Sequence, residues 1–511
     1  MPEKQTTKDM IASVLWRACD SFRGKIDSQL YKDYILVMLF IKYLSDTYDE
    51  HVKQYMEQFQ GNCQMVQQML ETDRFILDEK STFDFLYKQR NAPNIGEVIN
   101  KVLERIEEEN KTKLRGVFRN IDFNSESVFG NTKDRNAMLK NVLEEFSTLD
   151  LRPTVLGTSE VLGDAYEYMI GNFASDAGKK GGEFFTPSEV SELIARLVKP
   201  KENERIYDPT CGSGSLLIRT AKQVPSNKVQ LYGQERNGQT YALALMNMFL
   251  HKFDDAKIEW GDTLAEPKHL SNDALMTFDV EVANPPFSLD KWAMGFSGET
   301  DYKNFKMRPD LDTYRRFDLG VPPKSKCDYA FVLHMIKSLA EYGRMGIVLP
   351  HGVLFRGSSE GQIRKQLLKL NLLDCVIGLP ANLFFGTGIP AAILIFKKNR
   401  DRKNLLFIDA SQDGMYQKGK NQNKLREEDL QRIVDAYDKY ETQDKFTYVA
   451  TPEEIKENDY NLNIPRYVDT FEEEEPVDIE AVLKEEAEIK EELAVVEAKM
   501  ADYLSQLGIS E

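Results

Sequence analysis

The sequence predicts an α/β protein in which a helical N-terminal region precedes a parallel β-sheet with helices on both faces, and a long amphipathic helix ends the chain. Over about residues 8–170, apolar side chains recur at steps of three and four, the period of an α-helix. From Phe184 to about Arg400, strand-like and helix-like segments alternate, which is typical of a parallel sheet covered on both sides. We therefore divide the chain into 1–170, 171–410, a linker with some helix over 411–475, and the final helix over 476–511.

Length and composition fit two or three domains with a large core. The chain has 511 residues, of which 41% are hydrophobic. Its five cysteines are scattered without C-x-x-C spacing, so we expect neither a disulfide framework nor a metal site. The longest apolar run, Ile35–Ile41, is far shorter than the roughly 20 residues of a membrane span, and residues 1–16 lack the pattern of a signal peptide. We expect a cytoplasmic protein that is not attached to a membrane.

The most informative motif is Asn284-Pro285-Pro286-Phe287, which follows the strand-like run Phe278–Ala283. The Asn284 side-chain oxygen and the Pro285 carbonyl can accept both N–H groups of a planar exocyclic amine and leave its lone pair aimed at a methyl donor. The prolines restrict φ, so the turn is rigid before a substrate arrives. Phe287 offers a face on which a flipped-out base can stack. We predict that these four residues are the catalytic motif for methylation of an NH₂ group.

Upstream, Asp208 ends a predicted strand, and a loop rich in Gly and Ser leads into a helix. The small residues Ser213, Gly214 and Ser215 let the backbone approach a ligand closely, and a helix N-terminus favours a carboxylate. This pattern alone is weak evidence, because it would also fit a nicotinamide dinucleotide. The loop lacks the full G-x-G-x-x-G spacing, however, and it carries the acid at the strand end.

Acids also end the next two predicted strands. Glu235 closes the run Val229–Glu235, about twenty residues after the loop, where a carboxylate would grip a ribose diol. Asp262 ends a third strand that starts at Ile258, and it suits an adenine amine. Three acids at successive strand ends, followed by the catalytic motif, favour a nucleoside cofactor over three unrelated surface residues.

Three segments together resemble the DNA adenine-N6 methyltransferases: residues 181–187 (GGEFFTP), 208–214 (DPTCGSG) and 284–287 (NPPF). More narrowly, the chain resembles the methylation subunit of type I restriction-modification systems over nearly its whole length, including residues 460–467 (YNLNIPRY). The resemblance implies a seven-stranded Rossmann-like domain that uses S-adenosylmethionine. With the strand-end acids, the candidate cofactor residues are Glu183, Phe184, Phe185, Thr186, Pro187, Ser188, Asp208, Ser213, Gly214, Ser215, Glu235 and Asp262.

The same resemblance implies further structure and several partners. The runs Asp374–Leu379 and Ala391–Phe396 look like the final antiparallel hairpin of the seven-stranded sheet. The expected partners are DNA with a flipped-out target adenine, a DNA-specificity subunit that binds two methylation chains, and a restriction subunit in the full enzyme. No DNA-recognition domain is evident, so the target site would be chosen by the specificity subunit.

The net charge of −17 opposes a simple DNA-binding surface, since phosphate contacts depend on Lys and Arg. Residues 469–511 contain 15 acids and 3 lysines, which is −12, so the first 468 residues carry only −5. Between Tyr302 and Lys326, seven basic residues face three acids, and aromatic residues are interleaved with them. This loop suits phosphates and unstacked bases, or is an ordinary charged surface loop. In either case, a partner must supply most of the DNA affinity.

The acidic tail contains a heptad pattern with one polar break. Apolar residues alternate at steps of three and four over about four heptads, as in a coiled coil, at Ile479, Val482, Ile489, Leu493, Val496, Met500, Tyr503 and Leu507. Pro476 suits the start of the helix and Gly508 its end. The helix either folds back on its own domain or packs against another chain. By resemblance, the other chain is the specificity subunit, and the helix would pack against its helical spacer.

Other functions are compatible with part of the pattern. An RNA or protein-amide methyltransferase is a second possibility, although Phe287 in place of Tyr is unusual for protein-glutamine methyltransferases. An inactive scaffold is a third, and the intact strand-end acids and catalytic motif argue against it. Residues 414–421 nearly match a phosphate-binding P-loop, but Asn421 stands where Ser or Thr must hold Mg²⁺. We therefore expect the ATP-driven parts of a restriction system on another chain.

Overall fold

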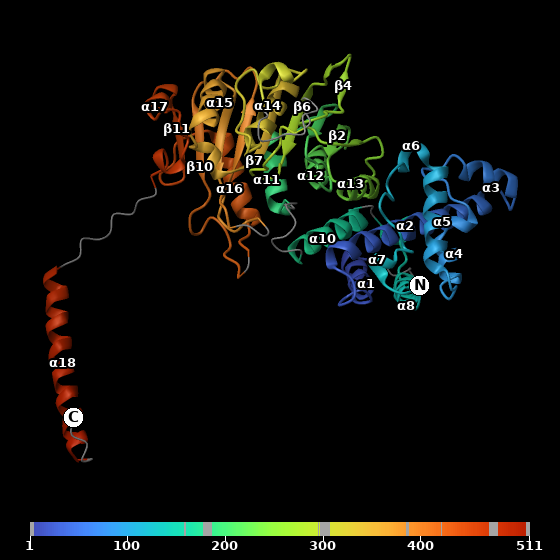
Figure 1. The fold of residues 1–511 in the computed structure, drawn as a ribbon, viewed down its shortest axis with the longest axis horizontal. Helices are drawn as coiled ribbons and strands as arrows, with labels where there is room; N and C mark the ends of the chain where they lie inside the picture. Colours follow the sequence, from blue (N-terminus) through green and yellow to red (C-terminus); the bar gives the residue numbers. More distant parts are fainter. Residues whose placement is uncertain are drawn as a thin grey trace. The chain divides into compact units, whose positions relative to one another are not determined.

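The computed structural model describes residues 5–157, 160–176, 186–294, 296, 307–384, 388–420, 422–469 and 479–506. It forms two compact units, Met1–Val468 and Asp469–Glu511. The first unit combines a helical region with a mixed α/β region, and the second contains one helix (Figure 1). The predicted α/β class is therefore confirmed.

The N-terminal helices form because apolar residues fall on one side of each. In α5, the buried residues Ile95, Ile99 and Ile106 follow the helical period, and polar residues fill the other side. The Thr7 side chain accepts a hydrogen bond from Met10 N and caps α1. The helices are α1 (Lys8–Asp20), α2 (Ser28–Gln58), α3 (Cys63–Leu70), α4 (Phe83–Lys88), α5 (Ile95–Glu109), α6 (Lys111–Leu114), α7 (Glu126–Phe129), α8 (Thr132–Phe146), α9 (Pro153–Leu156) and α10 (Glu160–Asp176).

One mixed sheet organises the α/β region. Its order among the described residues is β11-β10-β8-β9-β7-β6-β1-β2-β3, and β9 and β11 run antiparallel to their neighbours. The strands are β1 (Arg205–Asp208), β2 (Gln230–Glu235), β3 (Lys257–Trp260), β6 (Phe278–Ala283), β7 (Leu339–Pro350), β8 (Leu373–Gly378), β9 (Ala391–Lys397), β10 (Leu405–Asp409) and β11 (Thr447–Ala450). A separate two-stranded hairpin contains β4 (Leu270–Ser271) and β5 (Ala274–Leu275).

The sheet therefore has nine described strands, and the prediction of seven was wrong. The predicted antiparallel hairpin is present, because β8 pairs with β9, which lies between β7 and β8. Beyond it, β10 pairs in parallel with β8, and β11 pairs with β10. These two strands cover an edge of β8 that would otherwise be unpaired. β11 comes from the segment 411–475, so this segment is not only a linker with some helix.

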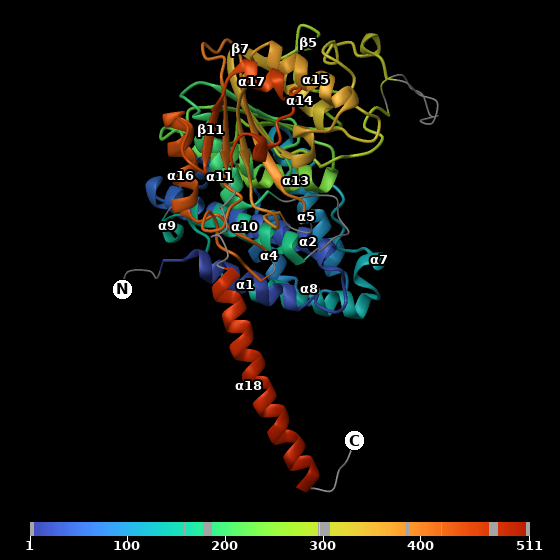
Figure 2. The same cartoon turned by 90° about the vertical axis from the view of Figure 1, so that its left-hand side faces the viewer.

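Helices cover both faces of the sheet, as predicted (Figures 1 and 2). Neighbouring residues of one strand enter two different cores: Ile393 and Ile395 of β9 belong to one apolar cluster and Leu394 to the other. The helices of this region are α11 (Ser188–Val198), α12 (Ser215–Lys222), α13 (Gly238–Leu250), α14 (Asp328–Ser338), α15 (Ser358–Lys369), α16 (Glu427–Lys439) and α17 (Pro452–Glu457).

The helical region shares the first of these cores with the sheet. Phe249 of α13 packs against Phe40 and Phe75, with ring centroids 6.3 and 5.4 Å away. Arg74 forms an ion pair with Asp254 and donates to the Phe249 carbonyl at 2.5 Å. The first cluster contains buried residues from the N-terminal helices and from one face of the sheet.

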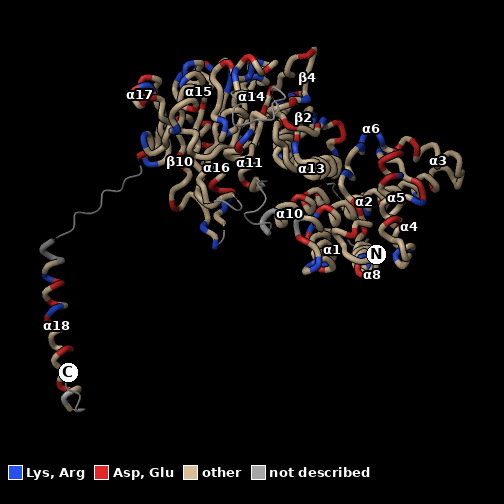
Figure 3. The backbone as a smooth tube through the Cα atoms, viewed as in Figure 1, with Lys and Arg blue, Asp and Glu red and all other residues tan. Residues whose placement is uncertain are grey.

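The second unit contains α18 (Ile479–Gln506), so the predicted final helix is confirmed as a helix. Its apolar residues Ile489, Leu493, Val496, Met500 and Tyr503 are all more than half exposed. Figure 3 shows acidic residues along the same helix. Its packing as a coiled coil stays a prediction, and Pro476, Leu507 and Gly508 lie outside the described residues.

Within the described ranges, no helix combines the length and apolar character needed to span a membrane. The same ranges contain no group of three His, Cys, Asp or Glu residues placed to hold a metal ion. All five cysteines are free thiols, and only Cys63 is exposed.

Candidate active site

The predicted strand-end residues meet at one edge of the sheet. β6, β1, β2 and β3 are consecutive parallel neighbours, so their carboxyl ends lie side by side. Asp208 and Glu235 are the last residues of β1 and β2. Asp262 and Asn284 come just after β3 and β6. In open sheets, ligands bind outside the carboxyl ends of the strands.

The loop after β1 has the backbone form that a close ligand requires. Gly212 and Gly214 have φ values of +53° and +78°, a region that residues with a Cβ rarely adopt. A Cβ on Gly214 would also lie 2.6 Å from Met248 Cε. Gly214 caps α12, which starts at Ser215, so the first N–H groups of this helix face the loop. The loop can therefore accept a carboxylate close to its backbone.

Asp208 is buried beneath this loop. Its carboxyl group accepts a hydrogen bond from Thr210 N at 2.9 Å. Burial raises its pKa from 3.8 to about 8, and the nearby Glu235 carboxylate adds to the increase. A cationic group at this edge would favour the ionised form of Asp208, because an opposite charge lowers the pKa of a carboxyl group.

Glu235 is held in place by backbone N–H groups. Its Oε2 accepts a hydrogen bond from Gly212 N at 3.0 Å, and its Oε1 accepts one from Asn237 N at 2.7 Å. Each carboxylate oxygen can accept more than one hydrogen bond. The two oxygens are therefore oriented and can still accept hydrogen bonds from a diol.

Asp262 is also held by a backbone N–H group. Arg119 of the helical region contacts Trp260, the last residue of the strand before Asp262. Asp262 Oδ1 accepts from Leu264 N at 3.0 Å, and Oδ2 lies 3.4 Å from Arg236 Nη1. The guanidinium of Arg119 lies 4.3 Å from the ring centre of Trp260, two residues before Asp262. No sequence motif points to Arg119, because the contact joins positions 141 residues apart.

Asn284 has one partnered and one unpartnered polar atom. Its Nδ2 donates to Thr186 Oγ1 at 2.8 Å, which places a predicted cofactor residue beside the catalytic motif. Its Oδ1 is buried and has no hydrogen-bond partner among the described residues. Such an atom is costly unless a ligand satisfies it. Asn284 Oδ1 is therefore an acceptor available to a substrate.

An aromatic pair lies beside the motif. The rings of Phe287 and Phe384 have centroids 5.7 Å apart and an interplanar angle of 65°. Phe384 is buried in the loop between β8 and β9, which sequence analysis did not connect with the site. Phe384 therefore packs against the last residue of the motif.

The turn after the motif is anchored by an ion-pair network. Ser288 N donates to Asp328 Oδ1 at 2.7 Å, and Arg356 forms an ion pair with Asp328 Oδ2. Arg356 also pairs with Glu360 at 2.8 Å. Cys327 Sγ donates to the Pro286 carbonyl at 3.4 Å. The two contacts made by the turn itself join residues 40 and 41 positions apart in the sequence, so the motif alone does not reveal them.

A buried polar cluster contacts the loop that follows β1 and the helix α12 that begins after it. Asn247 of α13 donates from Nδ2 to the Ser213 carbonyl at 2.9 Å. Glu167 of α10 pairs with Arg219 of α12 at 3.0 Å and lies 3.9 Å from His251 Nε2. Burial raises the pKa of Glu167 and lowers the pKa of His251 to about 3. Polar contacts therefore join helix α10 to helix α12 and α13 to the loop that follows β1.

The other predicted residues have different outcomes. Glu183, Phe184 and Phe185 lie outside the described residues. Pro187 is buried just before α11, and Ser188 begins that helix with an exposed side chain.

The interpretation of residues 302–326 as a DNA-facing loop is wrong for Arg316. Its side chain is only 1% exposed, and it forms an ion pair with Asp312 at 2.9 Å. It also donates to the carbonyls of Thr263 and Leu264 at 3.1 and 2.7 Å. Arg316 therefore fixes the loop against the residues after Asp262, because a buried guanidinium requires such partners. Residues 302–306 are not among those described.

Comparisons with known proteins agree with this geometry. The N-6 DNA Methylase family matches residues 157–476, and the HsdM N-terminal domain matches residues 11–146. The type I restriction enzyme MpnII methylase subunit of Mycoplasma pneumoniae is 32% identical, with 100% of this chain and 98% of that protein covered. The MjaVIII methylase subunit of Methanocaldococcus jannaschii is 34% identical, with 99% and 86% covered.

A solved structure gives the same result. The type I restriction-modification methyltransferase subunit from Streptococcus thermophilus superposes with a TM-score of 0.78 at 37% identity, over 91% of this chain and 100% of that chain. The fold and the matching family thus define a DNA methyltransferase of the N-6 class. Within that class, the chain belongs to the family of type I restriction enzyme methylase subunits.

Proposed function

We propose that the chain transfers a methyl group from S-adenosylmethionine to N6 of an adenine flipped out of DNA, at a site chosen by a separate specificity subunit. The observation that carries the proposal is the unpartnered acceptor Asn284 Oδ1 beside a row of strand-end acids. S-adenosylmethionine supplies a methyl group that its sulfonium already activates.

The residues at the sheet edge fit this cofactor. Glu235 would accept the ribose hydroxyls, since both of its oxygens are already oriented by backbone N–H groups. Asp262 would accept the adenine amine of the cofactor. Ser213, Gly214 and Ser215 would receive its carboxylate at the start of α12, and Asp208 would lie near its ammonium. Thr186, Pro187 and Ser188 come from the remaining predicted cofactor segment.

Asn284 and Pro285 would then orient the target amine. Asn284 Oδ1 and the Pro285 carbonyl accept its two N–H groups, so its lone pair points toward the methyl group. Pro286 keeps the turn rigid, and Phe287 supports the flipped base. No strong base is required, because the amine can lose its proton after attack; positioning and preorganised polar contacts supply most of the rate.

Assembly is the last part of the proposal. The exposed apolar stripe and the acidic face of α18 suit a partner helix, and a spacer of the specificity subunit would provide it. Two methylation chains would bind each specificity subunit, and a restriction subunit would complete the enzyme.

The deciding experiment is product analysis. The chain, co-expressed with its specificity subunit, is incubated with DNA and labelled S-adenosylmethionine, and the nucleosides are separated after digestion. We expect the label only in N6-methyl-2′-deoxyadenosine. Label in cytosine, in RNA or in protein would refute the proposal, as would no transfer by a complex that binds both substrates.

A further inference from the structure

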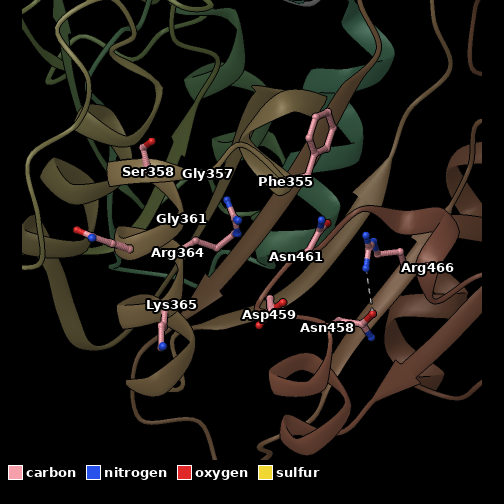
Figure 4. A pocket seen from close by; sticks show the side chains of 11 residues that line it. Phe355, Gly357, Ser358, Gly361, Arg364, Lys365, Asn458, Asp459, Asn461 and Arg466 are labelled. Carbon is pink, nitrogen blue, oxygen red and sulfur yellow. Dashed lines mark hydrogen bonds between the residues drawn. The ribbon is translucent and has the colours of Figure 1, made fainter.

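A cavity of about 350 Å³ lies between the first half of α15 and the segment that follows α17 (Figure 4). Gly357, Ser358 and Gly361 lie on the α15 side, and Asn458 and Asn461 lie on the other. None of its lining residues belongs to the predicted catalytic or cofactor set. The cavity is therefore a separate feature of the molecule.

The lining carries three cationic side chains and one acidic side chain, and the cations differ in their partners. Arg364 is buried and donates to the carbonyls of Tyr460 and Val353 at 2.7 and 3.0 Å, so it holds the wall together. Lys365 and Arg466 are exposed, and neither forms an ion pair within the described part of the chain. Lys365 lies 5.0 Å from the Tyr460 ring, and Arg466 donates to Asn458 Oδ1 at 3.3 Å. Two positive charges therefore remain beside the cavity without a carboxylate within ion-pair distance among the described residues.

A chain of hydrogen bonds and ion pairs connects the cavity to the turn that follows Asn284-Pro285-Pro286-Phe287. Arg364 donates to the Arg356 carbonyl at 3.0 Å, and the Arg356 guanidinium is paired with Asp328. Asp328 accepts from Ser288 N, the first residue after the catalytic motif. A ligand in the cavity would therefore contact the same framework that supports the turn.

We propose that this cavity binds a phosphate of the DNA backbone near the target adenine; the inference rests on the proposed function. Lys365 and Arg466 are the charged donors, and the amides of Asn458 and Asn461 add neutral ones. Gly357 borders open space, because a Cβ there would meet no atom within 4 Å. The chain has a net charge of −17, so its overall charge repels DNA. Cations without a carboxylate partner beside a cavity can instead bind the phosphates of one DNA strand.

The test measures DNA affinity of the chain assembled with its specificity subunit, at several salt concentrations. The variants are Lys365→Gln, Arg466→Gln and the double variant. Lys369→Gln is the matched control, since it removes the same charge from an exposed position of α15 outside the cavity. Each single change should reduce the slope of log affinity against log salt by about 0.9 per lost phosphate contact, on cognate and unrelated DNA alike. The control should leave the slope unchanged.

Two further variants are expected not to weaken DNA binding. Asp459→Asn removes the acid of the cavity and should tighten DNA binding, whereas Lys365→Arg should keep the wild-type slope. An unchanged slope in the double variant overturns the proposal. A titration with inorganic phosphate gives the second arm: loss of phosphate binding in the double variant, without a change in the DNA slope, would assign the cavity to free phosphate instead. Methyl transfer is scored separately, so a wild-type complex that binds DNA but methylates no adenine refutes only the proposed function.

Discussion

Replacing Glu235 with alanine tests the cofactor side of the site. Both oxygens of Glu235 are oriented by backbone N–H groups, at 3.0 Å from Gly212 N and 2.7 Å from Asn237 N. If these oxygens also accept the ribose hydroxyls, alanine removes hydrogen bonds to a charged acceptor, which contribute about 1.5–3 kcal/mol. S-adenosylmethionine should then bind about 10- to 150-fold more weakly.

The assay is calorimetric titration of the chain with S-adenosylmethionine, with the melting temperature measured for each variant. Glu259→Ala is the control, because it removes an exposed carboxylate from the neighbouring strand β3. Glu235→Gln should be no better than alanine, because its amide nitrogen would face a backbone N–H. A Glu235→Ala variant that binds the cofactor within twofold of wild type would refute the ribose role.

Four other changes probe the remaining parts of the argument. Asn284→Ala should lower the methyl-transfer rate by about 10²–10³ and leave cofactor affinity intact in a labelled-methyl assay; near-normal transfer would exclude the catalytic role. Asn247→Ala should weaken S-adenosylmethionine binding by about 1 kcal/mol, because the Ser213 carbonyl loses its donor; an unchanged dissociation constant would contradict this. Asp208 has a pKa raised to about 8 in the folded chain, so it stabilises the fold at low pH and loses this contribution as pH rises through 8. Denaturant unfolding without cofactor should therefore show the stability of Asp208→Asn rising relative to wild type between pH 5 and 8, and a constant difference would contradict it. A chain truncated before Val477 should fold and bind cofactor but fail to co-purify with the specificity subunit; recovery at wild-type stoichiometry would exclude an assembly role for α18.

Local patterns predicted the strand ends but not the contacts that join them. Glu235 was predictable because an acid at the end of an apolar run has a recognisable spacing. The burial of Arg316 was not, since its sequence neighbours are charged and aromatic, and only the fold brings Thr263 and Leu264 to it.

Long-range pairing explains the other differences. The run Leu405–Ile408 has the composition of a strand, yet its place beside β8 depends on residues about thirty positions away. The donor to the Ser213 carbonyl comes from Asn247, 34 positions along the chain, and no motif links the two. The number of strands and the supports of the site therefore required the structure.

The apolar cluster shared by the N-terminal helices and one face of the sheet has a consequence for protein engineering. Removing the helical region would expose Phe249 and its neighbours on α13, and the isolated methyltransferase part would aggregate or require a redesigned surface. Heating should melt the first unit in one calorimetric transition, because the helical region and one face of the sheet share a single apolar cluster. A chimera between two relatives should therefore exchange both regions together, with the crossover placed after Val468.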